Sequence, residues 1–355
     1  MKKSVAVGLS GGVDSAVTAS LLKDQDFRVT GVYLDCFAEP GCGTDQDRKD
    51  ALKIALKLKI PFKVLDFKKA YKEKVLEYFF SEYKKGRTPN PDIVCNREIK
   101  FGLFYNWAKK KGFGFVATGH YVKKLQTTNY KLQNNCFLVI PKDEHKDQTY
   151  FLYRLKQAQL KHLLFPLGDL TKEEVRKMAK KRGLHNFAKK DSYGICFVGD
   201  VELRKFLISR LGEKQGEVLD SQGKVVGEHS GHWFFTIGQR HGWEKAVKNK
   251  STFSPRLYVI DKDEKKNQVV IGTKKEAERK EFFIKEVHWI DKQSIKCLVR
   301  IRHRGKLLNC RLKKQKNNRL KVILDKPAFG IAPGQSAVFY SQDKNYLVLG
   351  GGVIN

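Results

Sequence analysis

The sequence predicts an α/β fold: a parallel sheet in the first half, then a small β-rich central domain and a C-terminal β-barrel. The first observation is that short apolar strands alternate with amphipathic helices, a pattern typical of a parallel sheet covered by helices on both faces. The second is that the segments after Gly212 are short, β-rich and separated by turn residues. We therefore expect three domains, at residues 1–211, 212–276 and 277–355.

Each element of the first half follows from its hydrophobic period. The expected strands are Val5–Leu9, Val29–Leu34, Phe62–Asp66 and Phe115–Thr118. The expected helices are Asp14–Lys23, Asp47–Leu58, Tyr71–Lys85, Glu98–Lys111, Thr171–Arg182 and Val201–Leu211. Thr171 followed three residues later by Glu174 is the signature of a capping box, which marks a helix start.

The second half contains only strand-like segments. In the central domain they are Lys224–Glu228, His232–Ile237, Arg256–Asp261 and Gln268–Thr273. In the last domain they are Ile295–His303, Leu320–Leu324, Ser336–Tyr340 and Tyr346–Leu349. Regularly spaced short strands of this kind favour a barrel for the last domain.

Charge and composition narrow the class of protein. The 70 Lys and Arg against 38 Asp and Glu give a net charge of +32, which attracts polyanions such as nucleic acids. Because lysine is spread from Lys2 to Lys344, a generally lysine-rich surface remains the alternative explanation. No apolar run is long enough to span a membrane, and Gly11-Gly12 and Asp14 interrupt the only signal-like start. We expect a cytoplasmic protein with no membrane partner.

The cysteines do not form a structural framework. There are seven, an odd number at irregular spacing, which argues against a set of structural disulfides. No pair has the Cys-x-x-Cys spacing, which disfavours a zinc or iron–sulfur site. Strand-like surroundings predict that Cys36, Cys136, Cys297 and Cys310 are buried packing residues, and nothing near Cys42 indicates chemistry.

A glycine-rich loop joins the first expected strand to the first expected helix. Its glycines allow a phosphate to approach the backbone, and the helix start offers free N–H groups to an anion. No Gly-Lys-Ser/Thr follows, so this is not a Walker loop. The hexapeptide from Ser10 to Ser15 resembles that of the PP-loop ATP-pyrophosphatases, which have an adenine nucleotide alpha hydrolase-like fold. The residues predicted to bind ATP are Gly8, Leu9, Ser10, Gly11, Gly12, Val13, Asp14 and Ser15.

Two cysteines lie in segments that favour chemistry. Cys95 follows a proline-rich loop, and we expect it at the start of the helix near Glu98, where the helix end and Arg97 and Lys100 would lower its thiol pKa. Cys196 lies in a loop flanked by Gly194 and Gly199, shortly after Lys189 and Lys190. The 101 residues between the two cysteines leave open whether their sulfurs meet.

These two segments resemble the cysteine motifs of the tRNA-specific 2-thiouridylase family (MnmA/TrmU). Further matching stretches lie at residues 117–121, 146–152, 165–168, 231–240 and 328–335, so the resemblance covers residues 5–353. Two departures are Arg302-His303, where the family has Arg-Tyr, and Trp233-Phe234-Phe235, where it has more tyrosine.

The resemblance implies an ATP-dependent tRNA sulfurtransferase that thiolates the 2-position of the wobble uridine in the anticodon arm. It implies that ATP, with Mg²⁺, also lies near Leu34 and Gly119, and that the uridine is flipped out, adenylated and given sulfur. It makes Cys196 the carrier of a persulfide loaded by a donor protein, and Cys95 its partner, with a Cys95–Cys196 disulfide as one outcome. The implied base and tRNA contacts are Asn90, Pro91, Asp92, His120, Lys146, Asp147, Gln148, Arg302, His303 and Gln335.

Two other functions compete with this one. A PP-loop ligase or amidotransferase acting on a small metabolite would use the loop from Gly8 to Ser15 but would leave both cysteines without a role. A non-catalytic RNA-binding protein would use the basic β domain but would leave the glycine loop unexplained. Neither the sulfur donor, nor the tRNAs modified, nor the order of sulfur-transfer steps, nor the oligomeric state follows from the sequence.

Overall fold

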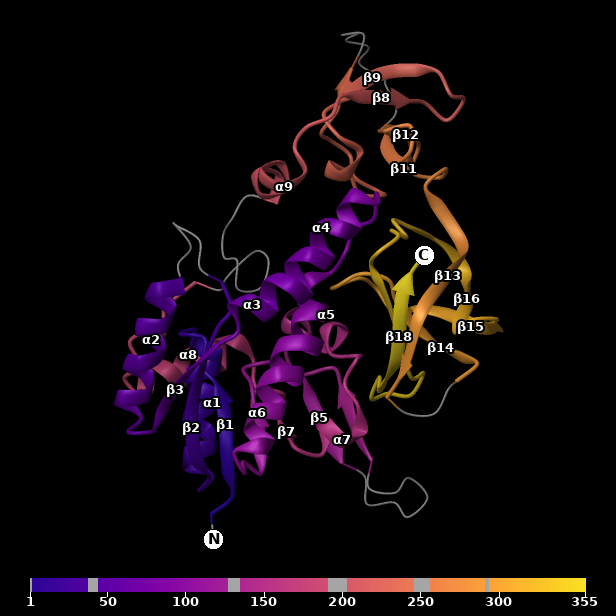
Figure 1. Cartoon of the computed structure of the whole chain (residues 1–355). Helices are drawn as coiled ribbons and strands as arrows, with labels where there is room; N and C mark the ends of the chain where they lie inside the picture. The colour runs from indigo at the N-terminus through magenta and orange to yellow at the C-terminus, as the bar shows by residue number, and fades with distance from the viewer. Residues whose placement is uncertain (1, 38–43, 127–134, 191–202, 246–255, 291–293) are drawn as a thin grey trace.

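The computed structural model describes residues 2–37, 44–126, 135–190, 203–245, 256–290 and 294–355. An N-terminal α/β domain occupies the lower part of Figure 1, a small β domain the top, and a barrel the right. This arrangement confirms the predicted fold class. No helix of the described residues is long and apolar enough to cross a membrane.

The N-terminal sheet has five parallel strands in the order β3-β2-β1-β4-β7. They are β1 (Ser4–Gly8), β2 (Arg28–Asp35), β3 (Phe62–Asp66), β4 (Phe115–Ala117) and β7 (Leu163–Leu164). Side chains alternate between two cores: Val5 and Val7 of β1 pack on one face and Ala6 on the other. The carboxyl ends of β1, β2 and β4 meet at one edge, which is where open α/β sheets bind ligands.

Helices cover both faces of this sheet. The core that contains Val5 also holds residues of α1 (Val13–Asp24), α2 (Thr44–Lys57) and α8 (Lys172–Lys181). The predicted capping box of α8 is confirmed: Glu174 N donates to Thr171 Oγ1, and Thr171 N donates to the Glu174 carboxylate.

The other face carries two longer helical runs than the sequence pattern predicted. One is α3 (Lys68–Tyr71), η1 (Lys72–Leu76) and α4 (Glu77–Lys84); the second is α5 (Pro91–Cys95), η2 (Asn96–Phe104) and α6 (Tyr105–Lys110). The expected helix start near Glu98 is therefore wrong. The helix begins at Pro91, because proline is compatible with the first helical position and the Asn90 side chain caps the end by accepting from Ile93 N at 3.2 Å.

A short insertion between β4 and β7 was not anticipated. It contains the hairpin β5 (Lys123–Gln126) and β6 (Cys136–Val139), then η4 (Glu144–Lys146), η5 (Thr149–Phe151) and α7 (Gln157–Leu160). Tyr150 and Tyr153 of this insertion share a core with Val338, Tyr340 and Val348 of the barrel. The insertion is therefore where the N-terminal domain joins the barrel.

The central domain is a five-stranded sheet in the order β10-β9-β8-β12-β11. The strands are β8 (Gly216–Leu219), β9 (Val225–His229), β10 (Glu244–Lys245), β11 (Tyr258–Asp263) and β12 (Gln268–Gly272). The predicted strand His232–Ile237 is wrong: residues His232–Phe234 form a 3₁₀ turn, η6. The turn forms because Asn267 Oδ1 accepts from His232 N at 3.2 Å, which draws the backbone away from strand pairing.

Helix α9 (Leu203–Leu211) precedes the central sheet but packs on the N-terminal domain. Phe206 lies against Phe79 and Phe80, with ring centroids 6.1 and 5.1 Å apart. Phe206 and Leu207 are buried in the same core as Ala6.

The C-terminal domain is a closed barrel of six antiparallel strands in the order β13-β16-β15-β14-β17-β18, as predicted. They are β13 (Glu278–Trp289), β14 (Lys296–Arg300), β15 (Leu308–Gln315), β16 (Arg319–Phe329), β17 (Ser336–Tyr340) and β18 (Val348–Ile354). Cys297 and Cys310, expected as packing residues, are buried in its core on paired strands. Cys36 and Cys136 are also buried, and Cys42 lies outside the described residues.

Candidate active site

The glycine loop is held in shape by its own two serines. Ser15 Oγ donates to Gly12 O at 3.0 Å and accepts from Ser10 N at 3.2 Å, while the two hydroxyls lie 3.2 Å apart. Helix α1 begins at Val13 with Gly12 as its N-cap and no side-chain cap. The first N–H groups of α1 therefore point toward the loop without a side-chain acceptor, which is an arrangement suited to an anion.

Glycine is required at position 11 for two reasons. Its φ is +76°, a conformation that L side chains rarely adopt, and a Cβ there would lie 2.4 Å from Asp47 O of α2. Asn186 Nδ2 donates to Gly11 O at 3.0 Å from the opposite side. The loop is thus fixed between α2 and the chain that follows α8.

An ion pair lies at the start of α1. Lys172 Nζ is 2.7 and 2.8 Å from the two carboxylate oxygens of Asp14, and Tyr121 Oη donates to Asp14 Oδ1 at 2.8 Å. Lys172 is only 13% exposed. Sequence spacing missed this lysine, since 158 residues separate it from Asp14. Lys172 places a positive charge beside the glycine loop, near the first backbone N–H groups of α1.

The two other residues expected near ATP lie at the same edge of the sheet. Leu34 is buried in β2, two residues beyond Val32, the partner of Gly8. Gly119 follows β4, and a Cβ on it would lie 2.8 Å from Ser15 N. Both positions therefore border the loop, and Gly119 has room only for a hydrogen.

Cys95 does not lie where the sequence pattern placed it. It is the fifth residue of α5, in the second turn, and its side chain is fully buried. Its thiol is shielded from bulk solvent. Cys196, in residues 191–202, lies outside the described residues.

The segment that leads toward Cys196 is anchored beside the glycine loop. Lys189 Nζ lies 2.8 Å from Asp47 Oδ1 and 2.6 Å from Asp50 Oδ2, both on α2. These contacts hold the pKa of the Asp50 carboxyl below its ordinary value against the opposing effect of burial. Arg176 donates to the backbone oxygens of Phe187 and Lys189.

The loop before Cys95 is held by the other two domains. Two residues of the barrel domain bond to Thr88. Thr88 N donates to Pro333 O at 2.8 Å, and Gln335 Nε2 donates to Thr88 O at 2.9 Å. The Thr88 hydroxyl also lies 3.0 Å from the Thr236 hydroxyl of the central domain. Gly334 permits this approach, because a Cβ on it would lie 2.9 Å from Thr88 N. Asn90, Pro91 and Asp92 thus follow a point where all three domains meet.

Two of the residues expected to contact tRNA, Gln148 and Asp147, bond to other parts of the protein in this structure. Gln148 Oε1 accepts from Tyr121 N at 2.8 Å, which links it to Asp14 through Tyr121. Asp147 is 2% exposed and accepts from Arg300 of the barrel and from Thr149. Arg302 is exposed and Lys146 half-buried. The buried Asp147 carboxylate faces protein partners and not solvent.

Two histidines in this region are neutral near pH 7. Burial lowers the pKa of His303 to about 4. The positive charges of Arg304 and Arg300 lower this pKa further, while the negative charge of Asp147 raises it. Burial, with Lys100, also lowers the pKa of His120 well below its ordinary value. The centroids of the His303 and Phe151 rings lie 4.4 Å apart, so His303 packs against Phe151 as another aromatic side chain would. Neither histidine offers a phosphate a positive charge.

Comparisons with known proteins cover nearly the whole chain. Residues 3–200 match the model described as the tRNA methyl transferase HUP domain, residues 204–273 the tRNA methyl transferase PRC-barrel domain, and residues 279–354 the aminomethyltransferase beta-barrel domain. The chain is 40% identical over 365 residues to the tRNA-specific 2-thiouridylase MnmA of Shewanella sp. strain MR-7, covering 99% of this chain and 96% of the relative. It is 40% identical to that of Pseudoalteromonas translucida, covering 99% and 97%.

Solved structures with a similar fold are more distant. NMN synthetase from Francisella tularensis has a TM-score of 0.36 at 20% identity and covers 59% of this chain and 72% of that one. A 4-thiouridine synthetase in complex with RNA and ATP has a TM-score of 0.37 at 17% identity and covers 58% and 50%.

Proposed function

The chain belongs to the tRNA-specific 2-thiouridylase family, and from this we propose that it thiolates the 2-position of the wobble uridine of tRNA in an ATP-dependent reaction. Two features of the N-terminal domain support the proposal. The serine-braced glycine loop lies at the carboxyl edge of the sheet, and the loop that leads into the Cys95 helix is held by both other domains. A ligase for a small metabolite would need the first feature and not the second.

The loop suits the phosphates of ATP. It offers backbone N–H groups at the start of α1 and the hydroxyls of Ser10 and Ser15, with Lys172 beside them. Gly11 and Gly119 leave no space for a side chain, because the backbone of Asp47 and of Ser15 lies where a Cβ would be, so both glycines let the loop pack closely against its neighbours. We assign ATP to this loop, with Leu34 and Gly119 at its border.

Mg²⁺ is proposed to accompany the nucleotide. No group of three or more His, Cys, Asp or Glu in the described parts of the chain could hold a metal ion by itself. This fits an ion that is carried mainly by phosphates and by one or two carboxylates. Asp14 is the carboxylate at the loop, and the ion would neutralise phosphate charge there.

The proposed reaction begins with the base. A uridine flipped out of the anticodon loop enters beside Asn90, Pro91 and Asp92, which follow the point at Thr88 where the three domains meet. Its 2-oxygen attacks the α-phosphate of ATP, pyrophosphate leaves and the base is adenylated. The loop N–H groups, Ser10, Ser15 and Lys172 are placed to orient the phosphates and stabilise their charge.

Sulfur transfer then uses two cysteines. A donor protein loads a persulfide on Cys196. In one order, Cys95 attacks the Cys196 sulfur, and the released hydrosulfide displaces AMP from the base. In the other, the terminal sulfur displaces AMP first, and Cys95 then attacks Cys196 to free the base. Both orders yield 2-thiouridine, AMP, pyrophosphate and a Cys95–Cys196 disulfide that a thiol must reduce.

The three structural units of the chain correspond to three proposed domains. We assign residues 1–211 to the catalytic unit, because α9 packs into its core, residues 212–276 to the central domain and residues 277–355 to the barrel. We also propose a cytoplasmic location for the enzyme, where it would meet its proposed tRNA substrate and persulfide donor protein.

Deleting the gene tests the function in the cell. Bulk tRNA from the deletion strain is digested to nucleosides and analysed by mass spectrometry. Loss of 2-thiouridine, restored by the wild-type gene and not by an Asp14→Ala gene, is the expected result. Unchanged 2-thiouridine would contradict the proposal and would favour the small-metabolite ligase.

A further inference from the structure

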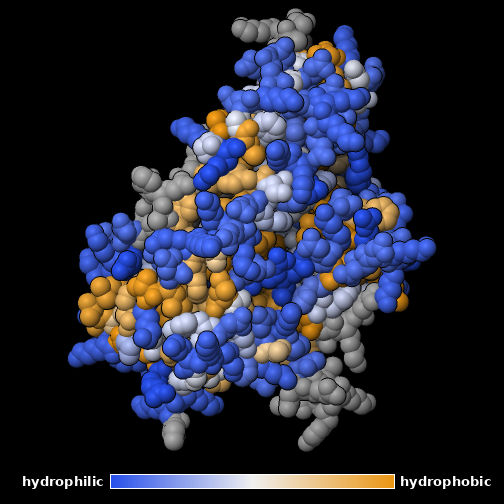
Figure 2. All heavy atoms as spheres, in the orientation of Figure 1, coloured by the Kyte–Doolittle hydropathy of each residue, from blue (hydrophilic) through white to orange (hydrophobic). Residues whose placement is uncertain are grey.

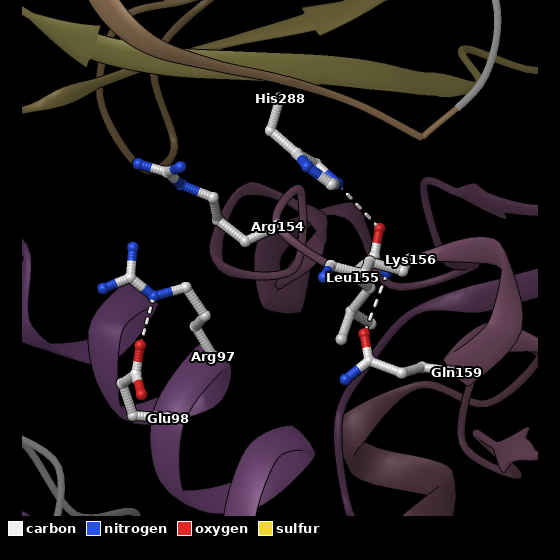
Figure 3. Close-up of a pocket in the computed structure, with 7 residues that line it drawn as sticks. All are labelled: Arg97, Glu98, Arg154, Leu155, Lys156, Gln159 and His288. Carbon is white, nitrogen blue, oxygen red and sulfur yellow. Dashed lines mark hydrogen bonds and ion pairs between the residues drawn. The ribbon is translucent and has the colours of Figure 1, made fainter.

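A basic cavity lies between the helix that carries Cys95 and the barrel. It has a volume of about 310 Å³ and is lined by Arg97, Glu98, Arg154, Leu155, Lys156, Gln159 and His288. Arg97 and Glu98 belong to η2, His288 to β13, and the others to the insertion. In Figure 3 the guanidinium groups of Arg97 and Arg154 extend toward the same side of the cavity. Three cations and one carboxylate therefore line it.

The neutral side chains of the cavity are already engaged by the protein. Gln159 Nε2 donates to Phe101 O at 2.6 Å, and its Oε1 accepts from Lys156 N at 2.9 Å. His288 Nε2 donates to Leu155 O at 3.0 Å. These groups fix the walls, and they leave the cationic side chains as the main hydrogen-bond donors for a ligand.

The cations retain unused donors. Arg97 donates Nε to Glu98 at 2.7 Å, and Arg154 donates to Glu286 at 2.7 Å and to Tyr153 Oη at 3.2 Å. Among the described residues, neither terminal amino group of Arg97 has a hydrogen-bond partner, and neither does the Lys156 ammonium. Cationic donors that line one cavity and are only partly satisfied by carboxylates suit a phosphate or carboxylate oxygen.

We propose that this cavity binds a backbone phosphate of the tRNA. The inference rests on the proposed function, which supplies the polyanion. Arg97 lies two residues after Cys95, and successive side chains on a helix diverge, so Cys95 is buried while Arg97 is 39% exposed. The lining residues include no Phe, Tyr or Trp on which a base could stack, and the His288 ring is held by its bond to Leu155 O. The site therefore positions the RNA and does not read its sequence.

The test is tRNA binding as a function of salt. In Arg97→Gln/Lys156→Gln, tRNA affinity at low salt should fall about tenfold or more, because hydrogen bonds to charged groups are lost. The slope of log K against log salt should become shallower by about 0.7–0.9, the value for one phosphate contact. In Lys156→Gln alone, the maximal thiolation rate at saturating tRNA should stay near that of the wild type while KM rises.

The matched control removes two charges elsewhere. Lys313→Gln/Lys314→Gln alters exposed residues of β15 and should leave the slope nearly unchanged. If the double variant of the cavity does not fold, Lys156→Gln alone carries the test, since its ammonium makes no hydrogen bond or ion pair with the described residues, and about half the effect is expected.

Three outcomes are informative. Wild-type enzyme that thiolates tRNA, with a cavity variant whose salt slope and KM match the control, would overturn the inference and leave the function intact. Inorganic phosphate that binds the wild type and not the variant, without any change in tRNA slope, would also overturn it by making the cavity a small-anion site. A wild-type enzyme that does not thiolate tRNA would instead refute the function.

Discussion

Lys172 Nζ lies 2.7 and 2.8 Å from the two carboxylate oxygens of Asp14, although 158 residues separate them in sequence. The pair joins the start of α8 to the start of α1 at the glycine loop. The Lys172 ammonium held there can bind the phosphates of ATP, and the Asp14 carboxylate can bind the accompanying Mg²⁺. The pair is therefore the electrostatic centre of the proposed ATP site.

Asp14→Asn should reduce ATP-dependent pyrophosphate release at least a hundredfold while leaving the fold intact. The amide can still accept from Tyr121, but the charge that holds Lys172 is lost. Pyrophosphate release by the purified variant is the measurement. Glu173→Gln is the control, since Glu173 is 75% exposed beside Lys172 and, among the described residues, forms its ion pair with Lys177. Wild-type release by Asp14→Asn would remove Asp14 from the ATP site.

Gly11→Ala should abolish ATP binding, and Gly112→Ala should not. Both glycines have positive φ, +76° and +78°, so each substitution costs about 1 kcal/mol of strain or more. Only at Gly11 does the new methyl group meet backbone, the Asp47 oxygen at 2.4 Å, whereas nothing lies within 4 Å at Gly112. Nucleotide titration of both variants separates the loop effect from the strain. Equal ATP affinities would contradict the assignment.

Acid should destabilise the protein below about pH 6.5. Burial lowers the pKa of His303 and of His229 to about 4, so the unfolded chain takes up protons that the folded chain excludes. The stability they contribute is present above pH 6.5 and is lost as pH falls toward 4. His303→Phe keeps a ring against Phe151 and should flatten this dependence in urea unfolding, whereas exposed His145→Asn should not. An unaltered slope in His303→Phe would contradict the burial argument.

Local patterns predicted the parts of the fold that depend on local chemistry. The glycine loop, the strands β1 to β4 of the parallel sheet, the Thr171 capping box and the barrel agree with the predictions, because turn residues and hydrophobic period act over a few positions. The two-residue strand β7 is too short to show a period and was not predicted. The prolines at positions 89 and 91 indicate a loop, so the sequence pattern does not predict the helix start at Pro91. The Asn90 side chain is nevertheless the cap of this helix. The η6 turn was missed because Asn267, 35 residues away, determines it.

Contacts between distant segments could not be predicted from spacing. Lys172 reaches Asp14, Asn186 reaches Gly11, and Gln335 reaches Thr88 only after folding. The same holds for Asp147, whose sequence suggested an exposed RNA contact and whose carboxylate is buried against Arg300. The Asp147 carboxylate links the barrel to the insertion.

The serine variants of the two cysteines should be blocked at different steps of sulfur transfer. Cys196→Ser should accept no labelled sulfur from a persulfide donor, because serine cannot form a persulfide. Cys95→Ser should accept the label on protein and not pass it to tRNA. Both should bind ATP, since the glycine loop is untouched. Label on Cys196→Ser alone would exchange the roles, and normal thiolation by either variant would remove that cysteine from the mechanism.

Reconstitution with purified components tests the central claim most directly. The enzyme is incubated with unmodified tRNA, a persulfide donor, a thiol reductant, Mg²⁺ and ATP, and the tRNA nucleosides are analysed by mass spectrometry. We predict 2-thiouridine at the wobble position, with one AMP and one pyrophosphate formed per thiolated base and no product when ATP is omitted. Thiolation without ATP, or AMP and pyrophosphate formed without any 2-thiouridine, would contradict the account.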